Sequence, residues 1–473
     1  MTRLVALSVL LCFACVADSS ADTIVNDVTQ LNPIRVHQVI TPTTLGEIVD
    51  AVRSHSGPIS IGGGRYSMGG QTATEGALQI DMRNFDRVVR FSKENKEITV
   101  QAGITWRKLQ EYIDPFDLSV QIMQSYDNFT VGGSLSVNVH GRYNGLGPIV
   151  LSVKSIRLVL ADGEVVMASP VENSDLFYGA IGGYGALGVI AEATLQLTDN
   201  VRVERRSQVM PLSAYRAYFE KNVRSNPEVI FHNADIFPGA FDTVRVTSYV
   251  KTDKPVTIHE RLVPPNADYS TDREIFALVA DWPGGKWIRQ HVVDPWIYRR
   301  PAVEWRNYEA SYDVRELEPV SRKRSTYVLQ EYFVPVDHLE PFVREMVRVL
   351  MEHHVNVINV SIRHSRADPG TLLAWARSDV FAFVLYYKQG TAAADRREVR
   401  TWTRELIDTA LKEGGTYYLP YQIVATKEQF HAAYPNARRL FRLKQRVDPL
   451  YKFRNHLWDA YYEPGDKDLS EAP

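Results

Sequence analysis

The chain has 473 residues, which is too long for a single ordinary hydrophobic core, so we expect two domains or one domain interrupted by another. Hydrophobic residues make up 45% of the chain and charged residues 23%, values that are typical of a globular protein. A formal net charge of −2 gives no electrostatic footprint for nucleic acid or for an anionic membrane, so nucleic acid is not an expected partner.

The N-terminus has the pattern of a secretory signal peptide. Arg3 supplies a positive charge, residues 4–16 are apolar apart from Ser8, and small residues lead up to Ala21. We predict that residues 1–21 are a cleaved signal peptide and that the protein is periplasmic or secreted. A buried first helix is the alternative.

Both cysteines of the chain, Cys12 and Cys15, lie inside this N-terminal stretch. If the stretch is removed, the mature protein has no thiol, no disulfide and no cysteine-ligated metal. A lipoprotein acylated at Cys15 is disfavoured by the residues that precede it. No other stretch is apolar for long enough to cross a bilayer, so we expect no transmembrane segment.

From about residue 33 to 197, short β-branched runs alternate with amphipathic runs. "TTLGEIVDAVRSH" predicts a helix behind a threonine cap, "GPISIGG" a strand, "ITVQAG" a strand and "TWRKLQEYID" a helix. "VKSIRLVLADGEVVMAS" predicts a hairpin closed by a type I′ turn at Asp162-Gly163, and "NSDLFYGAIGGYGALGVIAEATLQL" a helix, a turn and a strand. This order is typical of an α+β domain.

After about residue 201 glycine becomes rare and charged and aromatic residues increase. "VLQEYFVPVDHLEPFVREMVRVLMEHHVNVINVSIRHS" predicts a strand ended by Pro335, a helix over 339–353 and a second strand. A second strand and helix follow in "DVFAFVLYYK" and "REVRTWTRELIDTALKEGG". We expect a second α+β domain built on an antiparallel sheet. The last segment should return to pack on the first domain.

Three consecutive glycines, Gly62 to Gly64, follow the predicted strand of "GPISIGG". Such a run lets successive backbone N–H groups point into one concavity that binds phosphate oxygens; a mobile turn is the alternative. The dinucleotide pattern G-x-G-x-x-G fails because Ser67 stands where its last glycine belongs, and no Walker A lysine is present. The run therefore favours a diphosphate ligand without identifying it.

Two further glycine clusters narrow the range of possible ligands. "TVGGSLSVNVHG" alternates small residues up to His140 and Gly141, which permits a planar ring to lie against the backbone. His140 itself could equally be a hydrogen-bonded structural histidine. "GGYGALGVIAEA" places Gly188 at the start of a strand, where backbone can contact an adenine or ribose.

The ordered set "GGGRYSMGGQT", "TVGGSLSVNVHG", "NSDLFYGAIGGYGALGVI" and "VDPLYKFRN" resembles the vanillyl-alcohol-oxidase-type flavoproteins, which have a PCMH-type FAD domain. Within that family the chain looks nearest to aldonolactone and alditol oxidases, decaprenylphosphoryl-ribose oxidase and cytokinin dehydrogenase. The resemblance implies an α+β fold: a two-part FAD-binding domain over residues 22–200, a substrate or cap domain with an antiparallel sheet over 201–415, and a C-terminal segment, 416–473, that returns to the FAD domain.

The resemblance also implies which residues hold FAD. They are Gly62, Gly63, Gly64, Arg65, Tyr66 and Ser67 at the pyrophosphate; Thr130, Gly132, Gly133, Ser136, Asn138, His140 and Gly141 along the ribityl chain and flavin; Gly188, Val189 and Ile190 at the adenosine end; and Asn455 in the C-terminal motif. Many members carry a flavin-linked histidine where Arg65 stands. Because a guanidinium cannot be that nucleophile, we expect non-covalent FAD, with Arg65 either complementing phosphate or serving as a solvated loop charge.

For the substrate side, "VINVSIRHSRAD" resembles a stretch in which a Glu-x-Arg pair faces the flavin; here the arginine is Arg363 and the glutamate is replaced by Ser361. Arg363 would stabilise the reduced flavin, and its alternative is a surface pair with Asp368. Tyr421 stands where decaprenylphosphoryl-ribose oxidase has a lysine. Tyr421, a candidate catalytic residue, and its neighbours Tyr417 and Tyr418 could bind a sugar or act as acid or base, with packing as the alternative.

Glu331 in "LQEYFVP" is a further catalytic candidate, with an exposed strand carboxylate as its alternative. No His/Asp/Glu spacing predicts a metal site. We therefore expect an FAD-dependent oxidoreductase that transfers hydride from an alcohol carbon of a sugar, lactone or polyol to flavin N5, with oxygen or another electron acceptor. An amine- or cytokinin-like dehydrogenase and a non-catalytic periplasmic binding protein with the same fold remain as alternatives.

Overall fold

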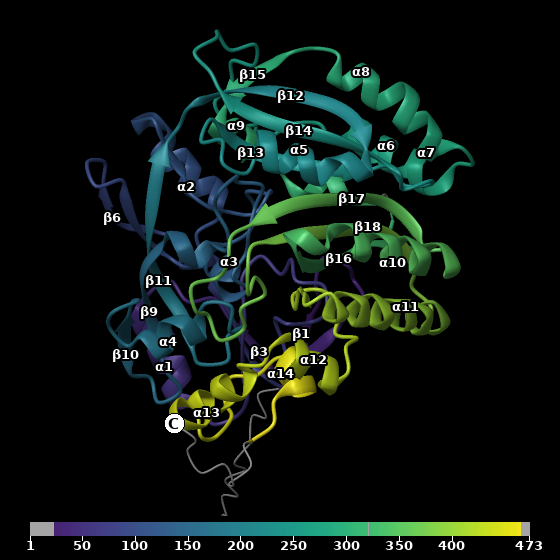
Figure 1. Cartoon of the computed structure of the whole chain (residues 1–473). Coiled ribbons are helices and arrows are strands. Elements are labelled where there is room, and N and C mark those ends of the chain that lie inside the picture. Colours follow the sequence, from purple (N-terminus) through teal and green to yellow (C-terminus); the bar gives the residue numbers. More distant parts are fainter. Residues whose placement is uncertain (1–22, 320, 465–473) are drawn as a thin grey trace, which may run out of the picture.

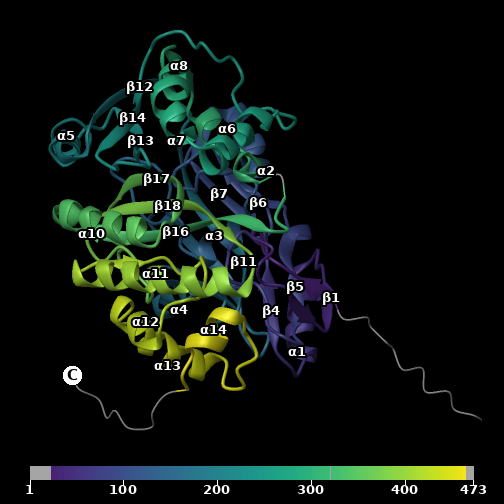
Figure 2. The same ribbon diagram turned by 90° about the vertical axis from the view of Figure 1, so that its right-hand side faces the viewer.

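A computed structural model describes residues 23–319 and 321–464 (Figures 1 and 2). The predicted signal peptide and its two cysteines lie outside these residues. Among the described residues, no helix has both the length and the apolarity needed to cross a bilayer.

The first part of the chain opens with two small sheets. β1 (Thr23–Val25) and β2 (Ile34–Val36) form an antiparallel pair, and β3 (Gln38–Ile40), β5 (Leu78–Asp81) and β4 (Ile59–Gly62) form a parallel sheet in that order. Between β3 and β4 the chain forms α1 (Leu45–Ser54), where Thr44 caps the first turn by accepting a hydrogen bond from the Glu47 N–H, as predicted. The strand predicted before the triple glycine is β4.

A second, six-stranded sheet follows. The order is β10-β9-β11-β7-β6, and β8 pairs with the far end of β11. Its strands are β6 (Val88–Ser92), β7 (Glu97–Gln101), β8 (Leu118–Val120), β9 (Val153–Val159), β10 (Val165–Ala168) and β11 (Val189–Asp199). The helices of this part are α2 (Trp106–Ile113), α3 (Val131–Ser136) and α4 (Ser174–Ala180).

The predicted hairpin exists, but its turn is not of type I′. A type I′ turn needs positive φ at both central residues, whereas only Gly163, at φ +80°, is left-handed and Asp162 is not. The Gly163 N–H instead donates to the Leu160 carbonyl, and β9 and β10 pair from Val159 and Val165 outward. A longer loop therefore closes the hairpin.

The second part is built on one eight-stranded sheet in the order β15-β12-β14-β13-β17-β18-β16-β19, with every neighbouring pair antiparallel. Its strands are β12 (Arg202–Pro211), β13 (Val229–Ile236), β14 (Thr243–Lys251), β15 (Ala302–Trp305), β16 (Ser325–Pro335), β17 (Asn356–Ser365), β18 (Val380–Gly390) and β19 (Thr416–Tyr417). The antiparallel sheet expected for this part is thus present.

Helices cover this sheet. They are α5 (Tyr215–Asn222), α6 (Ser270–Asp281), α7 (Gly285–Ile288), α8 (Asp294–Tyr298), α9 (Arg306–Glu309), α10 (Leu339–Glu352) and α11 (Ala393–Lys412). Pro335 ends β16 as predicted, and α10 buries Leu339, Phe342 and Met346 on one side, which are spaced by three or four residues. The strand–helix–strand unit of the sequence is β16, α10 and β17.

The C-terminal segment contacts the first part of the chain. It contains α12 (Lys427–Ala433), α13 (Ala437–Val447) and α14 (His456–Tyr461) at one end of the molecule, where α13 packs against α4 and α12 against α11 (Figure 1). Lys444 is completely buried, and its Nζ donates to the Ala186 carbonyl and to Asp448 Oδ2, both at 2.8 Å. Phe453 pairs with Ile59 of β4 through an isolated parallel bridge.

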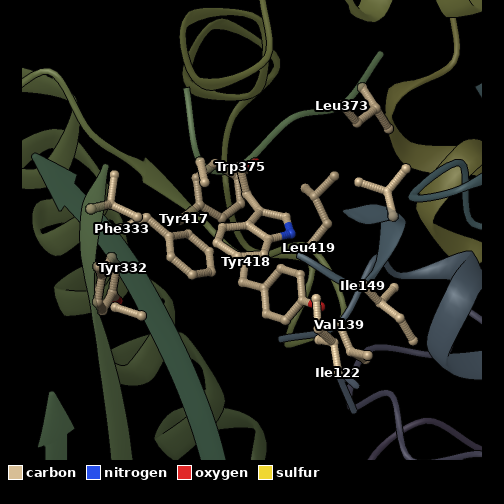
Figure 3. Packing of buried hydrophobic residues seen from close by; sticks show 14 of the residues in the cluster. Ile122, Val139, Ile149, Tyr332, Phe333, Leu373, Trp375, Tyr417, Tyr418 and Leu419 are labelled. Atoms are coloured by element: carbon tan, nitrogen blue, oxygen red, sulfur yellow. The ribbon is translucent and has the colours of Figure 1, made fainter. Parts of the chain in front are cut away.

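Trp375 joins the two parts of the core (Figure 3). Its ring stacks on Phe333 of β16 with centroids 4.2 Å apart, and its Nε1 donates to the Asn138 carbonyl at 2.9 Å. Tyr418 packs at the same junction and donates to the Val137 carbonyl at 2.8 Å. These contacts fix the chain around residue 138 against the eight-stranded sheet.

Candidate active site

A large cavity lies between the first part of the chain and the eight-stranded sheet. All the predicted site residues line it except Asn138, Gly141 and Val189. Those that do are Gly62, Gly63, Gly64, Arg65, Tyr66, Ser67, Thr130, Gly132, Gly133, Ser136, His140, Gly188, Ile190, Glu331, Arg363, Tyr421 and Asn455. Six separate stretches of the sequence, around residues 62–67, 130–140, 188–190, 331–363, 421 and 455, therefore converge on one space.

The loop after β4 supplies backbone donors to this cavity. Within the described part of the chain, the N–H groups of residues 63–67 donate to no other residue. Arg65 adopts a left-handed φ of +62°, and right- and left-handed residues in succession are how a backbone nest for anions is made. The loop therefore has unused donors where the sequence predicts a pyrophosphate.

Arg65 is not a freely solvated charge. Its Nη2 lies 3.0 Å from Asp81 Oδ2 at the end of β5, and its Nε is buried without a partner among the described residues. Partial burial lowers the pKa of the Arg65 guanidinium. One nitrogen is thus held by a carboxylate, while another remains available to a ligand in the cavity.

The second glycine cluster lies against this loop. A Cβ on Gly63 would stand 2.2 Å from Thr130 Oγ1, and one on Gly132 would stand 2.8 Å from the Ala102 Cβ. A side chain at Gly63 would collide with the Thr130 side chain, and one at Gly132 with the Cβ and carbonyl oxygen of Ala102, so both positions require glycine. Thr130 itself caps α3 by accepting a hydrogen bond from the Gly133 N–H at 3.3 Å.

Three predicted cofactor residues are placed elsewhere. Asn138 has a left-handed φ of +51°, and its Nδ2 donates to Asp368 Oδ2 at 2.8 Å. A Cβ on Gly141 would lie 2.3 Å from the Met123 carbonyl oxygen, and Val189, the first residue of β11, is buried in a hydrophobic cluster. These residues support the cavity wall from behind it.

The opposite wall comes from alternate residues of three neighbouring strands. Glu331 of β16 pairs with Val384 of β18, which pairs with Ser361 of β17 in the same row. Arg363 lies two residues beyond Ser361 and hence on the same face. Ser361 stands where the resemblance implies a glutamate. Glu331 supplies a carboxylate in the same row of the sheet, from β16 instead of β17.

Glu331 is the centre of a hydrogen-bonded cluster. His140 Nε2 lies 2.6 Å from Glu331 Oε1, and the Tyr421 hydroxyl donates to Glu331 Oε2 at 3.3 Å. The His140 and Glu331 side chains are only 4% and 3% exposed, so Glu331 is not the exposed strand carboxylate of the alternative reading. Burial, followed by the charge of Glu331, raises the pKa of the Tyr421 hydroxyl well above its usual range.

His140 has a neighbour at each ring nitrogen. Nδ1 lies 3.2 Å from the Gly141 carbonyl oxygen, and Nε2 lies 2.6 Å from Glu331 Oε1. His140 lines the cavity and is also hydrogen-bonded. The two roles that the sequence allowed for it, contact with a ligand and structural hydrogen bonding, are therefore compatible.

Arg363 lacks an anionic partner. No hydrogen bond or ion pair joins it to another described residue, its Nε is buried, and Asp368 is instead bonded to Asn138 and Thr371. It lies deep in the fold and keeps some accessible surface because it lines the cavity. Burial lowers the pKa of the Arg363 guanidinium, and the nearby Glu331 opposes that effect. The positive charge therefore faces the cavity.

Some cavity residues were not identified from the sequence. Gln71 belongs to the glycine motif "GGGRYSMGGQT". Its Nε2 donates to the carbonyls of Leu419 and Tyr421, both at 2.7 Å, and so holds the segment around Tyr421 against the loop that follows β4. Tyr386 and Arg322 line the cavity beyond Arg363. Their positions follow from strand register and from a loop conformation, for which the sequence carries no local signal.

Comparisons with known proteins define the class of the protein. Residues 36–169 match the family described as an FAD binding domain, so the chain contains a PCMH-type FAD-binding domain and is an FAD-linked oxidoreductase. It is 22% identical to L-gulonolactone oxidase of Mus musculus over 440 residues, which is 89% of this chain and 94% of that protein.

Two other relatives match over shorter stretches. The chain is 29% identical to mitochondrial L-galactono-1,4-lactone dehydrogenase of Arabidopsis thaliana over 227 residues, 48% of this chain and 33% of that protein. It is 33% identical to decaprenylphosphoryl-beta-D-ribose oxidase of Mycolicibacterium smegmatis over 144 residues, 30% of this chain and 31% of that protein. The chain thus spans about a third of each of these two relatives.

The residues that form the cavity fit FAD. The unused N–H groups of 63–67 and the buried Nε of Arg65 suit a pyrophosphate, and the glycines at 63 and 132 keep the wall free of side chains. Arg363 offers an unpaired cation on the opposite wall. Which of these atoms contact FAD stays a prediction.

Proposed function

We propose that this protein oxidises a carbon that bears a hydroxyl group on a sugar, sugar lactone or polyol. The observation that carries the proposal is the buried cluster of His140, Glu331 and Tyr421 beside the unpaired Arg363, on the wall that faces the FAD-binding loops. When bound, FAD supplies the acceptor for the hydride that leaves the substrate carbon.

Glu331 is the proposed general base. Oxidation of an alcohol releases one proton from the hydroxyl oxygen, and a carboxylate within hydrogen-bonding reach can accept it. His140 holds Glu331 through a 2.6 Å contact and so orients its carboxylate toward the cavity. Tyr421 orients the other carboxylate oxygen.

Arg363 is proposed to stabilise negative charge. An unpaired guanidinium in a site sheltered from water interacts strongly with charge that develops on a nearby oxygen or on the bound ring system. Arg363 lies on the same sheet face as Glu331, so both act on a substrate held between the two walls.

The substrate class rests on the relatives and on the lining of the cavity. Two of the similar proteins are named for the oxidation of sugar lactones and one for a ribose derivative. Tyr126, Tyr386, Tyr418 and Tyr421 bring aromatic surface to the cavity, which suits packing against the C–H face of a sugar ring.

We further propose that FAD is held without a covalent bond, because Arg65 stands on the loop where many relatives carry a flavin-linked histidine. Acid precipitation of the yellow holoenzyme tests this point. Flavin that stays in the supernatant supports the proposal, and flavin that precipitates with the protein contradicts it. His140 would then be the residue to examine for a covalent bond.

The activity is tested by mixing the purified holoenzyme with candidate substrates in the absence of oxygen. We expect sugar lactones, aldoses or polyols to bleach the flavin absorbance. Bleaching by amines alone would favour an amine- or cytokinin-like dehydrogenase, and a protein without flavin would favour a binding protein. Admitting oxygen to the bleached enzyme then shows whether oxygen or another molecule is the electron acceptor.

We also propose that residues 1–21 are removed and that the protein acts in the periplasm or outside the cell. The support is the sequence pattern alone: a positively charged start, an apolar stretch and small residues up to Ala21. N-terminal sequencing of the protein from its source should begin at Asp22. A chain that retains its first residues would contradict the proposal.

A further inference from the structure

All the tryptophans that are exposed in this protein lie close together in sequence. Trp282, Trp287 and Trp296 are 68%, 60% and 67% exposed. The remaining tryptophans of the chain are buried or half-buried, and they are Trp106, Trp305, Trp375, Trp402 and Trp458. Indole is too apolar to be left in water at three neighbouring sites without a function.

Trp287, Val292 and Trp296 lie along one side of a helical segment, and Trp282 stands just before it, at the C-terminal end of α6. α7, the π-helical turn Arg289–Val293 and α8 follow one another without a break. Positions 287, 291, 292, 295 and 296 are all exposed, whereas Gly285 and Asp294 are buried. The exposed positions are spaced by four or five residues, which matches one side of a helix that contains a π-helical turn. Val292 adds a 54% exposed aliphatic side chain to the stripe.

The same segment is positively charged although the whole chain carries −2. Between 282 and 300 it has four basic residues and one acid, Asp294. Asp294 is buried between Arg289 at 3.5 Å and Arg245 at 3.7 Å, so it does not neutralise the surface. Arg299 and Arg300 are exposed and form no side-chain ion pair with any described residue.

The segment lies at the outer edge of the eight-stranded part, far from α13 and the C-terminal helices (Figures 1 and 2). Its neighbour α6 connects it to the cavity. Val279 of α6 packs on Tyr327 and Tyr386, and Phe276 meets the Tyr386 ring edge to face at 5.6 Å. Tyr327 and Tyr386 line the cavity, so α6 contacts both the exposed segment and side chains that line the cavity.

We propose that this tryptophan patch (Trp282, Trp287, Val292 and Trp296, with Arg299 and Arg300) docks on the surface of a lipid bilayer that contains anionic lipids. Tryptophan prefers the boundary between lipid headgroups and acyl chains, because its ring is apolar and its N–H needs a polar partner. Arginines beside it attract anionic headgroups. The docking is peripheral, and it does not depend on the proposed substrate.

The test uses the full-length holoenzyme and sucrose-loaded vesicles of phosphatidylcholine with 30% phosphatidylglycerol, at low ionic strength. We expect the protein to sediment with these vesicles and its tryptophan emission to shift to shorter wavelength. We expect about tenfold less bound protein on pure phosphatidylcholine vesicles, and a similar loss for the triple variant Trp282→Ser/Trp287→Ser/Trp296→Ser. Brominated lipid should quench the wild type but not the variant.

Leu450→Ser is the matched control, because Leu450 is an exposed apolar residue outside the patch, at 78% exposure. It should bind vesicles like the wild type. All variants should retain flavin and unfold at the wild-type temperature, since none of the substituted residues is buried. A wild type that stays in the supernatant, or a triple variant that binds equally well, overturns the proposal. So does a dimer in gel filtration that the triple variant abolishes, since the patch would then face a second copy.

Discussion

His140 Nε2 lies 2.6 Å from Glu331 Oε1, although the two residues are 191 positions apart and belong to different parts of the fold. His140 follows the short helix of the FAD-binding part, and Glu331 lies in the middle of β16. Their pairing joins the two walls of the cavity at the point where Arg363 and Tyr421 also converge. The proposed chemistry depends on this pair.

Replacing Glu331 should remove most of the activity and leave the cofactor in place. In Glu331→Gln the amide cannot accept the substrate proton, so the rate of anaerobic flavin bleaching should fall about 10²- to 10⁴-fold while the flavin spectrum is retained. The control is Glu405→Gln, which changes another His–Glu pair, formed with His353 at 2.9 Å away from the cavity. Equal bleaching rates for wild type and Glu331→Gln would exclude Glu331 as the base.

Arg363→Met should slow bleaching by about 10²- to 10³-fold, because it removes the unpaired cation from a site sheltered from water. The midpoint potential of the bound flavin should also become more negative, a change that loss of packing alone does not predict. Arg363→Lys should restore part of both properties. The exposed Arg366→Met, near the end of the same strand, serves as control, and an unchanged potential in Arg363→Met would contradict this role.

Lys444→Met should destabilise the protein by about 3–5 kcal/mol, because it leaves Asp448 buried without its cation. The Lys444 ammonium also bonds the Ala186 and Phe453 carbonyls, which are part of the contact between α13 and the FAD-binding part. Urea unfolding of the holoenzyme measures the loss. Arg442→Met, at an exposed position of the same helix, should stay within about 0.5 kcal/mol of the wild type.

Stability should depend on pH through Glu316. Burial raises the pKa of this carboxyl to about 7, even though its Oε1 accepts a hydrogen bond from Tyr126 at 2.8 Å. Between pH 4.5 and 7 the folded protein therefore holds a proton that the unfolded chain has released, so the free energy of unfolding falls as pH rises through this window.

In Glu316→Gln the pH-dependent contribution of this carboxyl to the free energy of unfolding disappears. The difference in unfolding free energy between variant and wild type should change by about 3 kcal/mol across the window, measured by urea unfolding at several pH values. Glu94→Gln, at an exposed position, should follow the wild type. If the Glu316→Gln difference were the same at every pH, the carboxyl would not be protonated in the folded state.

Local features of the fold could be predicted from the sequence because local chemistry determines them. Thr44 caps α1, Pro335 ends β16, and the glycines at 62–64 follow a strand as expected. The hairpin turn at Gly163 was mispredicted, because a dipeptide preference does not fix the length of a loop.

Contacts between distant strands could not be predicted in the same way. The pairing of His140 with Glu331 depends on the register of β16, and the position of Glu331 opposite Ser361 depends on the order β17-β18-β16. Small residues near a cofactor look alike from sequence, so Asn138 and Val189 were indistinguishable from their cavity-lining neighbours. The net charge of −2 is a sum over the whole chain, so it likewise gave no sign of the basic segment around Trp296.

The central claim is that the wall formed by Glu331 and Arg363 oxidises a sugar-like alcohol. The most direct measurement is rapid anaerobic mixing of the holoenzyme with a sugar lactone, with the oxidised carbon carrying either hydrogen or deuterium, while flavin absorbance is followed. The account predicts bleaching that is several-fold slower with deuterium and is nearly abolished in Glu331→Gln. Flavin that no hydroxylated substrate bleaches, in a protein that binds FAD normally, would contradict it.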